Sequence, residues 1–153
     1  MLWVRVDNRL VHGQVIETWL PYTNASHLLV VNDDLAADQL RRTIISLAVP
    51  SRINLQFLTI AAVGASLAAI NPDENNALML VADCGDALRI FNAGVLFPVL
   101  NVGNLHYGPG KRQICAHVAL SEEDEACLIQ LKAHSVKFDF RCVPNENIHL
   151  EEW

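Results

Sequence analysis

The chain opens on an apolar segment that runs into a polar loop and then into a helical pattern, reading Leu2-Trp3-Val4-Arg5-Val6-Asp7-Asn8-Arg9-Leu10-Val11-His12-Gly13-Gln14-Val15. Aromatic and β-branched side chains at its start favour a strand. The polar loop and Gly13 separate this strand from the helical pattern that follows. We therefore predict a strand, a loop and a helix N-terminus in that order, with His12 where the helix begins.

His12 is the candidate centre of chemistry in this loop. Backbone N–H groups at a helix N-terminus point toward a bound anion, and Arg9 can offer a two-pronged donor to phosphate oxygens. The positive end of a helix disfavours the imidazolium form, so a nucleophilic nitrogen stays free at neutral pH. Asp7 could bond the other ring nitrogen and fix the tautomer, while Gly13 allows a ligand to approach the backbone closely. These neighbours favour a histidine that accepts a phosphoryl group.

Simpler roles exist for the same side chains. A lone histidine is more often a surface or capping residue, Asp7 could cap the turn, and Arg9 could be a solvated surface charge. The combination of an acid, an arginine, a histidine and a glycine in one short loop is what favours phosphoryl chemistry.

Composition indicates an ordinary globular domain. A length of 153 residues with 52% apolar and 18% charged residues predicts one domain spanning residues 1–153. The net charge of −6 argues against a nucleic-acid partner. Charges at Arg5 and Asp7 argue against a signal peptide, and no apolar run approaches the roughly 18 residues of a membrane span. We expect a cytoplasmic protein.

Neither the cysteines nor the histidines show the spacing of metal ligands. The four cysteines lack a CxxC pair and lie in or beside apolar stretches, so we expect them to be buried and reduced; they are Cys84, Cys115, Cys127 and Cys142. His27, His117, His134 and His149 are expected to be structural or exposed. The sequence thus predicts no metal site and no cofactor.

Strand-like and helix-like segments alternate along the chain. Apolar runs typical of buried strands occupy residues 28–31, 54–59, 77–82 and 97–101, with further candidates at 117–120 and, near a sheet edge, 136–142. Helical patterns occupy residues 37–48, 61–70, 83–92 and 121–133. The first of these helices carries one apolar face, made of Ala37, Leu40, Ile44, Leu47 and Ala48. This order predicts an α/β fold, an open and mainly parallel twisted sheet of about six to seven strands with helices on both faces.

Polar residues follow several of these strands. Ligands of open parallel sheets bind beyond the carboxyl ends of the strands. That rim would hold Asp7, Arg9 and His12 after the first strand and a loop rich in Gly, Asn and His after the fifth. The residues that we predict to contact phosphate or a partner protein are Gly13, Gln14, Asn32, Asn101, His106 and Lys111.

Common nucleotide-binding and phospho-acceptor motifs do not fit. Asp33-Asp34 is similar to the acidic corner of a receiver domain, but no acid follows the third predicted strand, so the pair more simply caps the next helix. The segment 108–111 lacks the P-loop spacing, and no GxGxxG occurs, which argues against a bound dinucleotide.

Taken together, the segments resemble the IIB component of the mannose/fructose/sorbose family of the bacterial phosphoenolpyruvate-dependent sugar phosphotransferase system (PTS). The matching segments are residues 5–15 with Trp19, 31–34 with Asp38 and Leu40, 86–88 with Gly94, 100–104 with His106-Tyr107 and Gly110-Lys111, and 121–124. They run through nearly the whole chain in the order of the family.

The resemblance implies a protein-Npi-phosphohistidine–sugar phosphotransferase. In such a protein phospho-IIA passes its phosphoryl group to His12, at Nδ1, and His12 passes it to a sugar carried by the membrane proteins IIC and IID. The resemblance places at Arg9 an arginine needed for transfer to sugar and at Asp7 an acidic residue of the same loop, whereas Asn8 replaces an Asp often found there. It also implies attachment to the inner face of the membrane through those permease partners, which hold the sugar pocket.

Two other functions fit the same residues. One is a regulatory phosphoprotein, in which phosphorylated His12 controls a binding event and no sugar is transported. The other is a non-catalytic module that holds a small anion at the same rim. Neighbouring IIC and IID genes would favour transport over regulation, and an acid-labile phosphohistidine would exclude the binding module.

Overall fold

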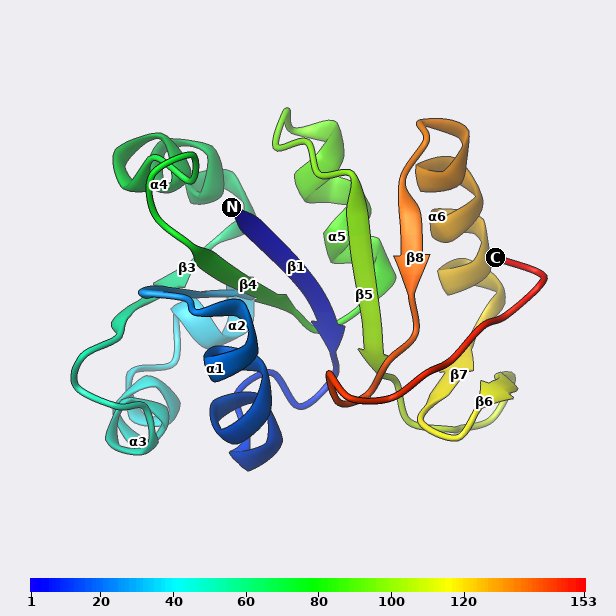
Figure 1. Ribbon diagram of the computed structural model, residues 1–153, viewed down its shortest axis with the longest axis horizontal. Coiled ribbons are helices and arrows are strands. Elements are labelled where there is room, and N and C mark those ends of the chain that lie inside the picture. The colour runs from blue at the N-terminus through cyan, green and yellow to red at the C-terminus, as the bar shows by residue number, and fades with distance from the viewer.

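The chain forms a central sheet of six parallel strands in the order β3-β2-β4-β1-β5-β8 (Figure 1). The computed structural model describes residues 1–153. The strands are β1 (Leu2–Asp7), β2 (His27–Val31), β3 (Asn54–Leu58), β4 (Ala77–Val81), β5 (Val99–Asn104) and β8 (Lys137–Asp139). The predicted α/β class with a mainly parallel sheet is confirmed, and the strand predicted near an edge is the edge strand β8.

Helices cover both faces of this sheet because its buried strands are apolar on both sides. One face carries a π-helical turn, η1 (Val15–Trp19), that continues into α1 (Leu20–Thr23), and α2 (Asp33–Ala36) and α3 (Gln39–Ala48) follow β2. The other face carries a 3-10 turn, η2 (Ile60–Ala62), with α4 (Val63–Ile70), α5 (Cys84–Asn92) and α6 (Glu122–Ala133). No helix of the structure combines the length and the hydrophobicity needed to cross a bilayer.

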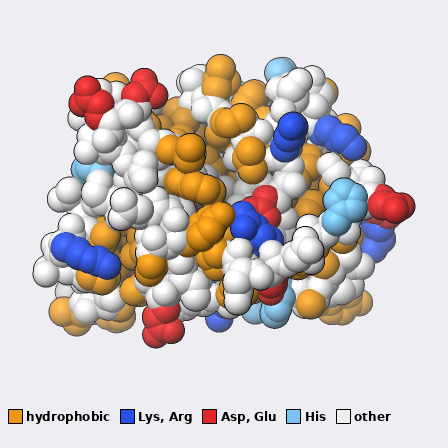
Figure 2. Space-filling model, in the orientation of Figure 1, with side chains coloured by type: hydrophobic (Ala, Val, Ile, Leu, Met, Phe, Trp, Pro, Cys, Tyr) orange, Lys and Arg blue, Asp and Glu red, His pale blue; other side chains and the backbone are white.

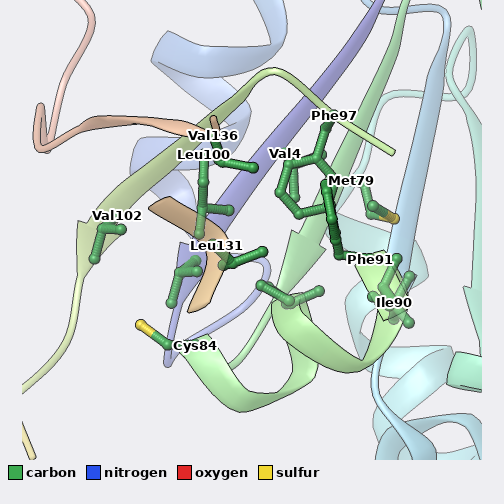
Figure 3. Close-up of a cluster of buried hydrophobic side chains, with 14 of the residues drawn as sticks. Val4, Met79, Cys84, Ile90, Phe91, Phe97, Leu100, Val102, Leu131 and Val136 are labelled. Atoms are coloured by element: carbon green, nitrogen blue, oxygen red, sulfur yellow. The ribbon is translucent and has the colours of Figure 1, made fainter. Parts of the chain in front are cut away.

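Successive residues of the central strands divide the core into two layers. Met79 and Leu100 point toward α5 and α6, where Ile90 and Leu131 complete a cluster of 24 buried residues (Figure 3). Leu78 and Leu80, one residue away on β4, pack with Trp19 on the α1 side. The period of two along the strands therefore fixes which side chains face the π-helical turn.

The segment predicted as a strand at 117–120 lies outside the main sheet. Its strand β7 (Val118–Leu120) pairs antiparallel with β6 (Arg112–Cys115), which the sequence analysis did not predict. One parallel bridge, Leu105 to Val118, connects this hairpin to the end of β5. Half of β6 consists of polar, exposed residues, Arg112 and Gln113. The strand therefore has no apolar run that could have predicted it.

The helix predicted at 37–48 is confirmed as α3, with the separate short helix α2 before it, but its apolar face is not buried. Asn32 caps α2 and Asp38 caps α3, whereas Asp33 accepts a hydrogen bond from the Ile60 N–H, so the prediction that the Asp33-Asp34 pair caps the helix is wrong. Three side chains of α3 are largely exposed, namely Leu40 (71%), Ile44 (58%) and Leu47 (84%). A helical period indicates that one face is apolar, but it does not indicate that another element covers that face.

A second apolar surface lies over the middle of the sheet, on the face seen in Figure 2. There α1 leaves the first half of β1 and β5 uncovered, and hydrophobic side chains gather (Figures 1 and 2). A groove of about 500 Å³ follows this surface, with Trp3, Tyr22, Leu96 and Val99 among its lining residues. It is on the side of the sheet opposite to α5 and α6.

Arg5 is a charged side chain buried within the sheet, with an exposed fraction of 1%. Its Nη1 donates to Asn101 Oδ1 at 2.7 Å and its Nη2 donates to Asp7 Oδ2 at 3.0 Å. Trp19 covers the guanidinium, with 4.9 Å between Cζ and the ring centroid. Gly103 on β5 leaves room for this group, because a Cβ there would lie 1.8 Å from Arg5 Nη1.

We expect Gly103→Ala to destabilise the protein. The added methyl group must displace a guanidinium that is held on several sides, and overpacking of this kind costs about 1–3 kcal/mol. Urea unfolding measures the effect. Gly64→Ala is the matched control: Gly64 lies in α4 with open space around its Cβ position, and a helical Gly→Ala change stabilises by about 0.4–1 kcal/mol. Equal unfolding free energies for Gly103→Ala and the unsubstituted chain would show that Arg5 is free to move.

Candidate functional site

The site is built on the loop that follows β1. Asp7 ends the strand, and the Leu10 N–H donates to the Asp7 carbonyl at 2.9 Å, which turns the chain back sharply. Leu10 has a φ of 56°, in the left-handed region that few side chains adopt, and its side chain is buried. The Ile16 N–H then donates to the His12 carbonyl at 3.2 Å, so a helix begins directly after His12. Its next turn is π-helical, a feature frequent at functional sites.

A buried carboxylate fixes the imidazole of His12. His12 Nε2 lies 2.7 Å from Asp7 Oδ2, and the exposed fractions of the two side chains are 14% and 0%. The other carboxylate oxygen of Asp7 accepts a hydrogen bond from the Arg9 N–H at 3.0 Å. Because an ionised carboxylate only accepts hydrogen bonds, this contact puts the proton of a neutral imidazole on Nε2. Nδ1 then carries the free lone pair.

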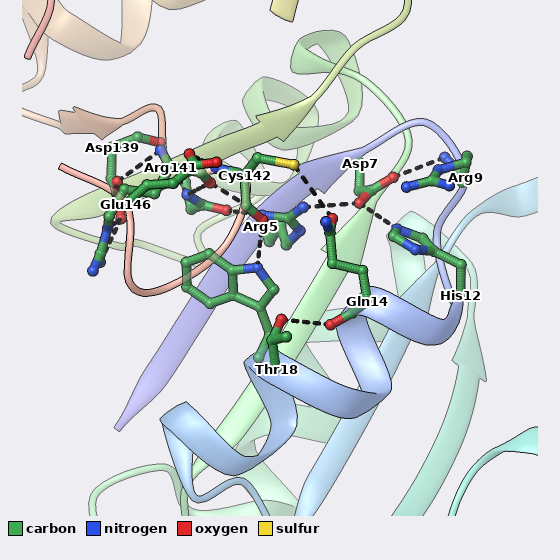
Figure 4. A network of polar contacts seen from close by, with 12 residues as sticks. Arg5, Asp7, Arg9, His12, Gln14, Thr18, Asp139, Arg141, Cys142 and Glu146 are labelled. Atoms are coloured by element: carbon green, nitrogen blue, oxygen red, sulfur yellow. Dashed lines mark hydrogen bonds and ion pairs between the residues drawn. The ribbon is translucent and has the colours of Figure 1, made fainter. Parts of the chain in front are cut away.

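Arg5 connects this carboxylate to the far end of the chain (Figure 4). Besides Asp7 and Asn101, its guanidinium contacts the Arg141 carbonyl at 3.3 Å. The Trp19 indole N–H donates to the Cys142 carbonyl at 2.8 Å. Arg5 was not among the residues predicted for the site. The signal that could have found it is the alternation Val4-Arg5-Val6-Asp7, which puts two charged side chains on one face of a central strand.

The structure brings some of the predicted site residues to His12 and gives others local partners. Gly13 has open space around its Cα, and Gln14 Oε1 accepts a hydrogen bond from Cys142 Sγ at 3.3 Å. Asn32 caps α2 by accepting from the Leu35 N–H. The side chain of Asn101 is occupied by Arg5 and by the carbonyls of Asp139 and Arg141.

A polar hollow lies on one side of the loop. It has a volume of about 330 Å³, and its lining residues include Arg9, His106 and His117. The ammonium group of Lys111 donates to the His106 carbonyl at 3.1 Å, which places this lysine beside the hollow. Arg9 and His106 are exposed. An anion could therefore meet several donors here without the burial of an unpaired charge.

An apolar groove lies on the other side. It has a volume of about 380 Å³, and His12, Ile16, Ile44 and Ala48 are among its lining residues. Since Ile44 also belongs to the exposed face of α3, the groove and that face form one surface that reaches His12. The imidazole therefore lies between a polar hollow and an apolar groove.

The four cysteines are all free, as expected. Cys84 and Cys142 are buried, and burial raises the pKa of each thiol above its usual value, so both are protonated at neutral pH. Cys115 and Cys127 are only partly buried, so the expectation of burial is wrong for these two. Each lies in an element with one solvent-facing side.

Connections leave β1 and β5 toward opposite edges of the sheet, which makes the gap between them the switch point where open α/β sheets bind ligands. Asp7 and Asn104 are paired across this gap. His12 and Arg9 follow directly after Asp7, at the carboxyl end of β1. The position of the site thus agrees with the general rule for this architecture.

Comparisons with known proteins show the family to which the chain belongs. The family model described as the PTS system sorbose subfamily IIB component matches residues 1–151. The N-acetylgalactosamine-specific phosphotransferase enzyme IIB component 2 of Escherichia coli K12 is 32% identical over 142 residues, which cover 93% of this chain and 90% of that protein. The sorbose-specific EIIB component of Klebsiella pneumoniae is 30% identical over 142 residues, with 93% and 87% covered.

Solved structures of related proteins have the same fold as this chain. The crystal structure of the IIBSor domain of the sorbose permease from Klebsiella pneumoniae superposes with a TM-score of 0.88 at 28% identity, covering 96% of this chain and 91% of that one. An N-acetyl-galactosamine-IIB component from Streptococcus pyogenes gives a TM-score of 0.89 at 28% identity, with 95% and 90% covered. The chain therefore belongs to the sorbose subfamily of IIB components of the PTS, a family of phosphotransferases.

Proposed function

We propose that this IIB component is a phosphoryl carrier that accepts the group from phospho-IIA on His12 and donates it to a sugar taken up through a IIC/IID permease. The observation that supports this proposal is the contact of 2.7 Å between His12 Nε2 and the buried Asp7 carboxylate. It holds the ring at the start of a helix with one nitrogen engaged and the other available. A regulatory protein would use the same acceptor, so transport itself needs the test given below.

The acceptor step needs little chemistry beyond positioning. Nδ1 of His12 attacks phosphorus while the P–N bond to the donor's phosphohistidine breaks, so one P–N bond replaces another. The Asp7 carboxylate stabilises the positive charge that develops on the imidazole of His12. Backbone N–H groups of the helix start and the guanidinium of Arg9 are the groups that would neutralise the transferring oxygens.

The donor is the IIA component in this proposal. One relative supports it by name, the mannose-specific EIIAB component of Escherichia coli K12, which is 28% identical over 142 residues. This chain covers 44% of that protein. The donor must bring its phosphorylated side chain to His12, so its footprint should include the apolar groove beside His12 and the exposed face of α3.

The sugar step would use the polar side of the loop. Arg9 is exposed at the edge of the hollow that His106 and His117 also line. Its planar fork can follow the phosphoryl oxygens as the group leaves His12. We expect the permease to present the sugar hydroxyl from this side.

The first test is phosphorylation of the purified protein by a phospho-IIA donor. The unsubstituted chain should gain one acid-labile phosphate, and His12→Ala should gain none because the nucleophile is missing. His149→Ala is the matched control, since His149 is an exposed histidine of the C-terminal tail, and it should be labelled normally. Labelling of His12→Ala at the level of the control would exclude His12 as the acceptor.

Arg9→Lys should separate acceptance from donation. Lysine keeps the charge but loses the two-pronged geometry, so the variant should still be labelled by phospho-IIA. We expect transfer to sugar to slow by roughly 10- to 100-fold in membranes that contain the cognate IIC and IID. Sugar phosphate formation is the measurement. If the rate of sugar phosphate formation is unchanged, Arg9 has no role beyond surface charge. If neither the variants nor the unsubstituted chain form sugar phosphate, the regulatory alternative is favoured.

Binding of IIA should map to both sides of His12. In NMR chemical shift mapping, addition of unlabelled IIA should shift the amide signals of Gly13, Ile44 and the segment 106–111. High salt should weaken the binding. Ile44→Ser should weaken binding, whereas Ile129→Ser should not, because Ile129 is similarly exposed (60% against 58%) but lies on α6. Perturbations confined to the opposite rim, around residues 71–76, would contradict this footprint.

A further inference from the structure

We propose that His117, Cys142 and Glu146 form a zinc-binding site beside the polar hollow that Arg9 and His117 line. Their ligand atoms, one from each side chain, all lie within 4.8 Å of one another. His117 lies in the turn between β6 and β7, while Cys142 and Glu146 follow β8. Two distant segments of the sequence thus bring a nitrogen, a sulfur and an oxygen ligand to one place.

This ligand set suits Zn²⁺. Zinc binds imidazole nitrogen, thiolate sulfur and carboxylate oxygen in tetrahedral geometry at about 2.0–2.3 Å. Ligand atoms around one such ion are roughly 3.5 Å apart, so the three side chains need to close by only about 1 Å. His117 is exposed, which leaves the fourth position open to water. Hard cations such as Mg²⁺ would find only one oxygen ligand side chain.

Hydrogen bonds hold the three ligand residues in place. The Cys142 N–H donates to Glu146 Oε2 at 2.9 Å, which fixes the carboxylate while its other oxygen stays available. The Cys142 carbonyl accepts from the Trp19 indole, and the His117 carbonyl accepts from the Leu105 N–H at 3.0 Å, so the backbone of both residues is anchored. The imidazole of His117 makes no hydrogen bond within the chain, and it is free to turn toward the ion.

Zinc at this position would tie the C-terminal tail to the β6–β7 hairpin. The thiol must lose its proton when the metal binds, since thiolate is the ligand. Because binding releases the thiol proton, zinc affinity should fall as the pH decreases. The thiol of Cys142 donates to Gln14 Oε1 at 3.3 Å, and this hydrogen bond would be lost when the thiolate binds the metal.

Cobalt and zinc titrations of the full-length, reduced protein test the site. Co²⁺ should bind with one-to-one stoichiometry and give a thiolate-to-cobalt charge-transfer band in the near ultraviolet, which Zn²⁺ should abolish by displacement. Cys142→Ser should remove the band. His117→Ala and Glu146→Gln should each lower zinc affinity by at least about tenfold, because each removes one of three ligands.

Two controls use neighbouring residues of the same kinds. Cys115→Ser and His106→Ala remove a partly buried thiol and an exposed imidazole close to the hairpin, and both should leave the zinc affinity unchanged. The proposal is overturned if no charge-transfer band forms, if the band depends on Cys115, or if His117→Ala binds zinc as tightly as the unsubstituted chain. The last result decides even if Cys142→Ser fails to fold, because His117 is at the surface.

Discussion

The buried ion pair between Arg5 and Asp7 is the interaction on which the site depends. Both side chains are almost completely buried, so each needs the other as a partner. Arg5 holds the Asp7 carboxylate in place, and Asp7 in turn holds the imidazole of His12. Removing one member of such a pair typically costs about 3–5 kcal/mol, because the other charge is left buried and alone. The residues around the pair are correspondingly restricted: Gly103 gives it room, Asn101 accepts a hydrogen bond from Arg5 Nη1, and Trp19 covers the guanidinium.

The pattern of the sequence was sufficient for the class of the fold and for the loop of the site. Runs such as residues 28–31 and 77–81 have no polar member, which is typical of parallel strands covered on both faces. The position of His12 at a helix start follows from a local signal, the strand, loop and glycine that precede the helix. Local patterns could not indicate which element, if any, packs against each apolar or polar surface. The apolar face of α3 gave the same signal as a core helix, although nothing covers it, and β6 gave no apolar signal because it pairs only within a small exposed hairpin.

The two sides of His12 differ in the kind of contact that they offer. On the side of α3, apolar side chains are exposed at a free-energy cost that a partner surface would recover when it covers them. On the side of the β5–β6 loop, charged and polar groups stay in water and can exchange ligands rapidly. A carrier that meets two partners in turn benefits from such a difference, because a partner that also covers the apolar side gains a free energy of binding that a partner at the polar side alone does not.

The contacts of Arg5 and Trp19 with the carbonyls of Arg141 and Cys142 join residues 136 and 123 positions apart. The loop that carries His12 follows β1, yet the carbonyls that complete its support follow β8. Contacts so distant in sequence form late, after the loops between them have closed. The central strands can therefore pair early in folding, whereas the support of the His12 loop is complete only after the segment that follows β8 has docked.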